Sequence, residues 1–168
     1  QVQAAHMLTK RHKLTSLKTK PSCADICPWT QQVWVCLPNQ KLIEIYDFFN
    51  EALIDTIELY DLQYPYKIYF CLETQEAFIL DQWKSTVCVL KSITASETHN
   101  ASHQQNEGSY ILDRTIGARG TSLGQLMQPH GIATFISSSV DMERYNLIVA
   151  DTGNNRVQVL SAVTGQFL

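Results

Sequence analysis

The sequence Asn146-Leu-Ile-Val-Ala-Asp-Thr-Gly-Asn-Asn-Arg-Val-Gln-Val-Leu160 decides the fold class. Residues 147–150 are wholly apolar and belong to types that favour β-strands. Residues 151–155 are turn formers, and beyond them the side chains of Val157 and Val159 fall on one face of a second strand. The pattern therefore predicts a β-hairpin. A lone hairpin is marginally stable in water, so this one requires neighbouring strands.

The same hairpin pattern occurs three times along the chain. Segments 43–46 and 87–90 match the second strand of the hairpin, 157–160. Segments 33–36 and 77–80 match its first strand, 147–150, and the three copies of this first strand are separated by 44 and 70 residues. A proline opens a further strand before each hairpin, at Pro21, Pro65 and Pro129, where its missing N–H costs no ladder hydrogen bond. Fourth strands are expected at 52–57 and 110–116. Each repeat unit is thus predicted to hold four antiparallel strands.

These repeats divide the chain into four parts. Residues 1–20 are expected to supply the last two strands of a preceding unit, at 2–5 and 14–17. Residues 21–60 form one unit, and residues 61–117 form a second with a long polar insertion at 92–109. Residues 118–168 form a third unit, with a lengthened loop at 136–146 and an incomplete fourth strand. About three units and a half are expected, as a piece of a longer array.

Four-stranded units repeated at this spacing are typical of the blades of a β-propeller, so we predict an all-β fold. The residues Pro129-His-Gly-Ile-Ala133, followed by Val149-Ala-Asp-Thr-Gly-Asn-Asn-Arg-Val-Gln-Val159, closely resemble an NHL repeat. The two earlier units share the spacing and apolar pattern but lack the Asp-x-Gly-Asn-x-Arg core, so they would be divergent blades. The resemblance implies a partial propeller that is part of a six-bladed NHL propeller.

The turn of the best-preserved hairpin has an expected structural role. Gly153, like Asn39 in the first unit, is expected at a left-handed backbone position. Asp151 is expected to cap the turn, and Arg156 to form a local ion pair or to cover a seam between blades. We do not interpret these two residues as a catalytic pair.

Charge is distributed unevenly along the chain. The net charge is −3, but five of the thirteen bases lie in residues 1–20 without an acid, which leaves eight bases against sixteen acids, or −8, in residues 21–168. A basic arm could touch nucleic acid, whereas a solvated surface is the commoner role of such residues. The acidic body argues against a large phosphate-binding face. No apolar run is long enough to span a membrane, so no membrane partner is expected.

The cysteines indicate a reducing compartment. Their odd number and apolar surroundings favour buried free thiols at Cys23, Cys27, Cys36, Cys71 and Cys88, and hence a cytoplasmic location. Cys23 and Cys27 lack a second Cys/His pair at zinc spacing, and His130 is a single histidine within a repeat element, so no metal or other cofactor is expected. A glycosylation sequon at Asn100 leaves secretion open.

Propeller topology predicts where a binding site lies. The connections at 37–41, 60–64, 82–85, 118–128 and 151–155 would emerge on one face. The candidate partner-binding residues on that face are Tyr60, Tyr64, Trp83, Lys84 and Arg119. Exposed aromatic rings with Lys or Arg suit protein or RNA contacts. The alternative, and the commoner role of such residues, is that Trp83 and the tyrosines pack between blades.

We therefore predict a non-enzymatic interaction scaffold, with no catalytic residue, that binds a protein partner through this face. The resemblance implies that the protein could select substrates for ubiquitination, with an enzymatic activity carried by another domain. An RNA-binding NHL domain in post-transcriptional regulation is one alternative, and the −8 body ranks it below protein binding. A metal-dependent, lyase-like propeller enzyme whose site lies in further blades is another. The remainder of the propeller would be needed to close the fold.

Overall fold

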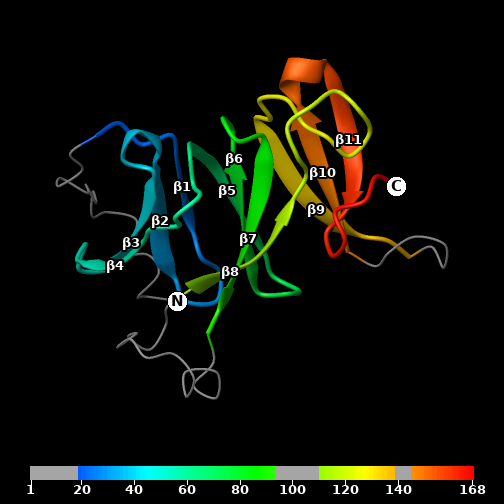
Figure 1. Cartoon of the computed structure of the whole chain (residues 1–168). Coiled ribbons are helices and arrows are strands. Elements are labelled where there is room, and N and C mark those ends of the chain that lie inside the picture. The colour runs from blue at the N-terminus through cyan, green and yellow to red at the C-terminus, as the bar shows by residue number, and fades with distance from the viewer. Residues whose placement is uncertain (1–18, 94–109, 139–144) are drawn as a thin grey trace.

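The apolar segments form strands in the computed structural model, which describes residues 19–93, 110–138 and 145–168. The strands form three antiparallel sheets without a crossover (Figure 1). The first sheet contains β1 (Cys23–Ile26), β2 (Gln32–Leu37), β3 (Leu42–Asp47) and β4 (Leu53–Ile57); the second contains β5 (Pro65–Cys71), β6 (Glu76–Asp81), β7 (Thr86–Ser92) and β8 (Tyr110–Ile116). The third contains β9 (Gly131–Ile136), β10 (Tyr145–Asp151) and β11 (Arg156–Ser161), paired in the order β11-β10-β9.

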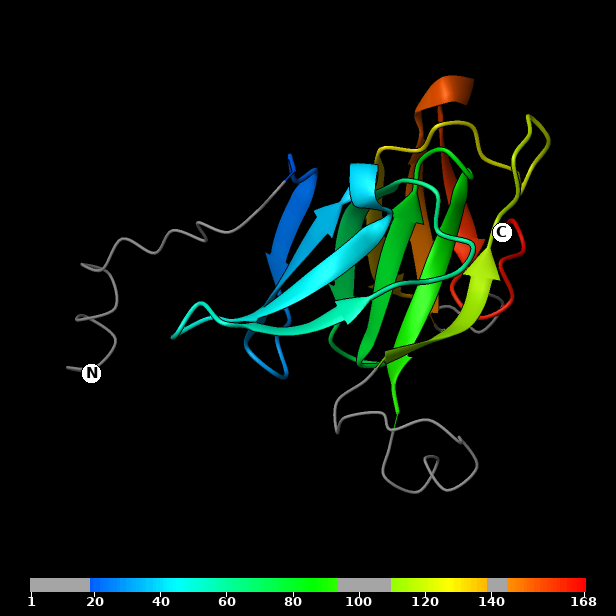
Figure 2. The same cartoon turned by 60° about the vertical axis from the view of Figure 1, so that its left-hand side comes forward.

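The all-β fold is confirmed, and its four-stranded antiparallel sheets are consistent with blades of a propeller-like fold. The three sheets stand side by side with their first strands together, because β5 contacts both β1 and β9 (Figures 1 and 2). They do not close into a ring. The strands expected at 2–5 and 14–17, and residues 94–109 of the expected insertion, lie outside the described residues.

Some predicted boundaries were wrong. β1 and β9 begin two residues after Pro21 and Pro129, whereas β5 begins at Pro65 itself, with a bulge between Pro65 and Lys67. β7 continues to Ser92, which was assigned to the polar insertion. The loop expected at 136–146 is shorter at both ends, because its first and last residues pair as strands: Ile136 with Tyr145, and Phe135 with Asn146. Where the start of a fourth strand is expected in the third sheet, Phe167 forms an isolated antiparallel bridge to Leu160.

The second sheet is buried on both faces, which explains the continuous apolar runs of β6 and β7. Along β6, Ala77 and Ile79 pack toward the first sheet, and Phe78 and Leu80 pack toward the third. Successive strand residues point to opposite faces, so a strand buried on both sides cannot alternate with polar residues. Trp34 adds edge-on contacts to Phe70 and Tyr110, with ring centroids 5.2 and 4.5 Å apart. Most of the described apolar core therefore lies between sheets.

The middle turn of each sheet places one residue in the left-handed region, but that residue is not the predicted one. It is Lys41 (φ 59°), Ser85 (φ 60°) or Asn155 (φ 53°), at the end of each turn. Gly153 is required for a different reason. A Cβ there would lie 2.5 Å from Cγ and 2.6 Å from the carbonyl oxygen of Met127, to which the Gly153 N–H donates a hydrogen bond (2.8 Å). Gly153 thus permits a close approach between the turn and the loop of residues 118–128.

Candidate binding face

Two buried carboxylates fix the loops of the face that is uppermost in Figure 1, formed by residues 37–41, 60–64, 82–85, 118–128 and 151–155. We call this the upper face, and the opposite ends of the sheets the lower face. Asp81 ends β6, is fully buried, and accepts hydrogen bonds from the backbone N–H groups of Gln63 (2.6 Å), Tyr64 (3.1 Å) and Lys84 (3.0 Å). It thereby ties the loop before β5 to the turn after β6. The topology predicted for these connections is confirmed.

Asp151 holds the equivalent place in the third sheet and is also fully buried. Its carboxylate accepts from the N–H of Met127 (2.6 Å), the amide of Asn154 (2.8 Å), Nε of Arg156 (2.8 Å) and the amide of Gln158 (3.1 Å). Burial alone would raise the pKa of Asp151, but these hydrogen bonds and the Arg156 charge outweigh it and hold the pKa below its usual value. The expected cap was wrong, because the carboxylate does not cap the backbone of its own turn.

Arg156 makes the predicted ion pair and also clasps the neighbouring loop. Its guanidinium donates to three backbone carbonyls, those of Thr121 (2.9 Å), Ser122 (2.7 Å) and Gln125 (2.8 Å). Residues 118–128, which contain no described strand, are therefore held by the third sheet. The Asp-x-Gly-Asn-x-Arg sequence builds the scaffold of the upper face.

An aromatic stack stands on the main chain that Asp81 holds. The rings of Tyr64 and Trp83 lie parallel, with centroids 4.6 Å apart and an interplanar angle of 11°. The N–H of Gln82 donates to the carbonyl of Tyr64 (3.0 Å), and Asp81 binds the backbone on both sides, so both rings rest on fixed main chain. Trp83 remains 58% exposed. Packing between blades, the alternative role, does not describe Trp83.

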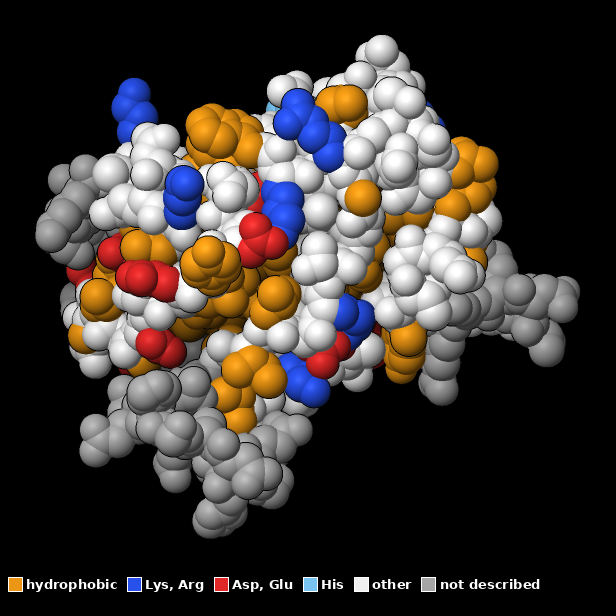
Figure 3. Space-filling view, in the orientation of Figure 1, with side chains coloured by type: hydrophobic (Ala, Val, Ile, Leu, Met, Phe, Trp, Pro, Cys, Tyr) orange, Lys and Arg blue, Asp and Glu red, His pale blue; other side chains and the backbone are white. Residues whose placement is uncertain are grey.

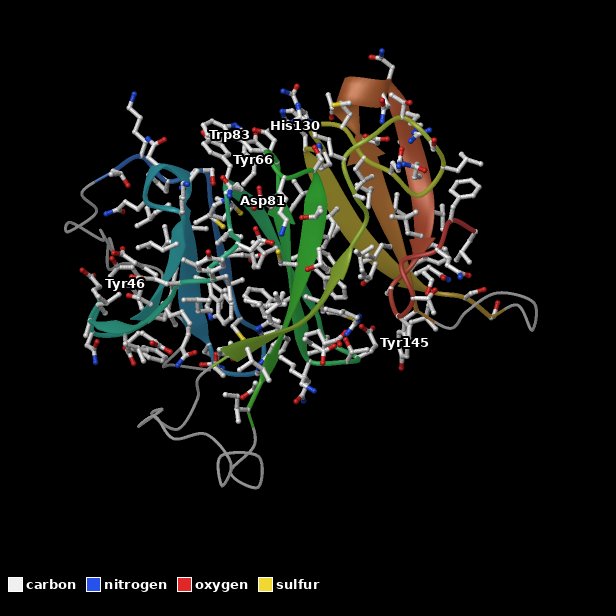
Figure 4. All side chains as sticks on the ribbon, viewed as in Figure 1. Tyr46, Tyr66, Asp81, Trp83, His130 and Tyr145 are labelled. Atoms are coloured by element: carbon white, nitrogen blue, oxygen red, sulfur yellow. The ribbon has the colours of Figure 1, made fainter. Side chains whose placement is uncertain are left out.

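A second pair adjoins the stack. Tyr66 and His130 meet edge to face, with centroids 5.1 Å apart (Figure 4). Nδ1 of His130 lies 2.9 Å from the carbonyl of Gln128, which can only accept, so Nδ1 carries the proton. Nε2 is then the acceptor for the side-chain amide of Gln82 at 2.8 Å. Sequence reasoning missed Tyr66, Gln82 and His130 as site residues, although Tyr66 and His130 each follow a proline at or just before the start of a first strand.

The predicted site residues are only partly brought together. Tyr64 and Trp83 form the stack, and Lys84 pairs with Asp61. Tyr60 is fully exposed on a separate hollow of about 410 Å³. Arg119 is exposed, and its side chain has no hydrogen bond or ion pair within the described part of the chain. No described contact joins Tyr60 or Arg119 to the stack.

This arrangement supports stacking and hydrogen bonding. Within residues 19–93, 110–138 and 145–168, no three His, Cys, Asp or Glu side chains come together as a metal site requires. All five cysteines are free thiols. Among the described residues there is also no helix with the length and apolar character needed to cross a bilayer.

Comparison with known proteins shows similarity of fold. No protein-family model and no curated protein matches the chain. A solved auxiliary nutrient binding protein from Bacteroides ovatus ATCC 8483 superposes with a TM-score of 0.71 at 14% identity, and one from Bacteroides thetaiotaomicron VPI-5482 with 0.69 at 12%. Each match covers 98% of this chain but 39% of the other. The chain thus has the fold of a part of these larger proteins.

Proposed function

We propose that this chain is a non-enzymatic binding module whose upper face contacts a protein partner. The observation that carries the proposal is the Tyr64–Trp83 stack, which holds a largely exposed indole on main chain fixed by a buried carboxylate. Tryptophan and tyrosine contribute most to protein interfaces when they are held rigidly, because little conformational entropy is lost on binding. The indole stacks on Tyr64 and is otherwise largely exposed, so much of its surface remains for a partner to cover.

Two further features support binding. The solved proteins of similar fold are described as nutrient binding proteins, which is compatible with a binding role here, although that ligand belongs to them. The residues that resemble an NHL repeat, 151–156, hold the loop of residues 118–128 in place, so their contribution to this face is structural. Our proposal extends to an NHL-type propeller completed by further blades, located in the cytoplasm, that selects substrates for a ubiquitin ligase.

A matched pair of variants tests the proposal. Trp83 and Leu72 are exposed to a similar degree, 58% and 60%, but Leu72 lies in the β5–β6 turn on the lower face. Proteins retained by the immobilised chain from nuclease-treated extract would be compared quantitatively for wild type, Trp83→Ala and Leu72→Ala. We expect a set of proteins that Trp83→Ala loses at least roughly tenfold and Leu72→Ala retains.

Two results would contradict the proposal. If both variants retain the same proteins as wild type, the upper face is not the binding surface. If proteins are captured only from extract that has not been treated with nuclease, and RNA is captured from that extract, the RNA-binding alternative replaces protein binding.

A further inference from the structure

The two faces of the molecule carry different charge. On the lower face and at the adjoining strand ends, the described acids are Asp25, Asp47, Glu51, Glu73, Glu76 and Asp113. The described cations there are Lys91 and Arg114, and both are paired: Lys91 with Asp113 (3.0 Å), and Arg114 with Glu76 (2.6 Å). That end of the molecule therefore presents excess negative charge.

The upper face and its strand ends have excess positive charge. Lys20, Lys41, Lys67 and Arg119 are exposed, and none pairs with a carboxylate among the described residues. Asp81 and Asp151 are buried, Glu44 near the upper end of β3 is half-buried, and Asp61 is paired with Lys84. Glu58 is therefore the exposed acid without an ion pair in the described part of this face. Figure 3 shows Lys and Arg side chains beside apolar ones along the upper edge, with most acidic side chains below them. The −8 of residues 21–168 conceals this separation.

Hydrogen-bond donors accompany the exposed aromatic rings. The indole N–H of Trp83 and the phenol of Tyr64 make no hydrogen bond within the described ranges. An extended peptide offers backbone carbonyls that need such donors, and an aromatic or proline ring on it can stack on the indole. The exposed cations of this face would attract carboxylates, because charges act over roughly 10 Å at moderate salt.

We propose that the segment recognised by the upper face is an extended, acidic peptide that places a ring on Trp83. This inference rests on the proposed function and names the chemistry of its partner. Basic residues and stacked rings could also serve single-stranded nucleic acid, which requires a cationic track along the stack. Here the cation adjacent to Trp83 in sequence, Lys84, is neutralised by Asp61, and the exposed Glu58 would repel a phosphate chain. A peptide with separated carboxylates can place them beside the exposed cations and away from Glu58.

The test uses three fluorescein-labelled probes with the whole 168-residue chain: a peptide of alternating Glu and Tyr, its Lys/Tyr counterpart, and oligouridine. Binding is measured by fluorescence anisotropy. We expect the Glu/Tyr peptide to bind more tightly than the other two. Trp83→Ala should weaken its binding roughly tenfold or more, and Leu72→Ala should leave it unchanged.

A second pair of variants isolates charge. Arg119→Gln and Ser92→Glu change the net charge equally, but Ser92 is exposed at the lower end of β7. We expect Arg119→Gln to weaken Glu/Tyr binding roughly threefold, and Ser92→Glu to have little effect. Equal losses from both variants would mean that overall charge alone attracts the probe, and would overturn the inference.

The probes also separate this inference from the proposed function. Trp83-dependent binding of the Lys/Tyr peptide in preference to Glu/Tyr would overturn the acidic partner and leave a protein-binding face. Preference for oligouridine with a steep salt dependence would overturn both in favour of RNA. If Trp83→Ala and Leu72→Ala reduce binding of the Glu/Tyr peptide equally, the peptide does not bind at the upper face.

Discussion

Two buried aspartates, Asp81 and Asp151, organise the upper face. Each carboxylate accepts backbone N–H groups from the loop that enters the first strand of its own sheet, which supplies the hydrogen bonds a buried charge needs. The corresponding residue of the first sheet is Leu37, which is buried in apolar surroundings. That the two aspartates are turn residues could be predicted from sequence. Their partners could not, because residues 118–128 have no periodicity that places Met127 beside Asp151.

We expect removal of the Asp151 carboxylate to be strongly destabilising. Asp151→Ala leaves the N–H of Met127 and Nε of Arg156 without this acceptor and the Arg156 charge without its partner, so the free energy of unfolding should fall by about 3–5 kcal/mol. Asp61→Ala is the control, since Asp61 is 62% exposed in its ion pair with Lys84 and should cost less than about 1 kcal/mol. Urea denaturation measures both. Similar losses in the two variants would contradict the buried role of Asp151.

The same carboxylate should make stability depend on pH in the acid range. The native pKa of Asp151 lies below its usual value of about 3.9, so its contribution is fully present above about pH 4 and is lost as pH falls through the native pKa. Asp151→Asn should therefore be less stable than wild type at pH 7 and should lose less stability toward pH 3. Asp113 also has a lowered pKa, chiefly through its hydrogen bond from Arg114, but it is common to both proteins. Parallel stability curves of the two proteins would refute this assignment.

Among the elements, strands were easier to predict than connections. β6 and β7 have both faces buried and show as apolar runs, and β8 was predicted at its observed bounds. The path of the loop at residues 118–128 is set by hydrogen bonds from its backbone to the side chains of Asp151 and Arg156. These two side chains lie about 30 residues farther along the sequence. Strand patterning is local, whereas a loop path depends on such distant partners.

Arg114 on β8 joins the second sheet to the third. Its guanidinium binds both oxygens of Glu76 (2.6 and 3.0 Å), and it also donates to the carbonyl of Ala162, beyond β11, from Nε (3.0 Å) and from a terminal nitrogen (2.8 Å). Arg114→Lys keeps the charge but cannot make this fork, so we expect a loss of about 1–3 kcal/mol. Hydrogen exchange should increase in β9, β10 and β11 more than in the first sheet.

The control for Arg114 is a nearby cation whose ion pair lies within one sheet. Lys91 pairs with Asp113 on the adjacent strand β8, and its side chain is 42% exposed. Lys91→Ala should cost less than about 1 kcal/mol and leave exchange in the third sheet unchanged. An equal effect of both variants on that sheet would show that Arg114 is no link between sheets.

At the scale of the molecule, three sheets packed face to face leave most thiols inaccessible. Cys27, Cys36, Cys71 and Cys88 are buried, and Cys23 is half-buried. Burial is the chief cause that raises the pKa of Cys88 to about 11 and that raises the pKa of Cys36. The apolar surroundings predicted such thiols from sequence; which sheets enclose each one follows only from the packing.

Thiol labelling therefore reports the opening of the whole assembly. A thiol with a pKa near 11 holds little thiolate even at pH 9, so Cys88 should stay slow to label when the pH is raised to 9. Cys27, Cys36 and Cys71 should also label more slowly than Cys23, because they are buried and the reagent cannot reach them. In denaturing urea all five should react quickly. Mass spectrometry of labelled peptides would assign each rate.

Cys27, Cys36 and Cys88 lie between the first and second sheets, whereas Cys71 lies between the second and third. If Cys71 alone labels early, the third sheet opens by itself; a common rate for all four shows that the sheets open as one unit.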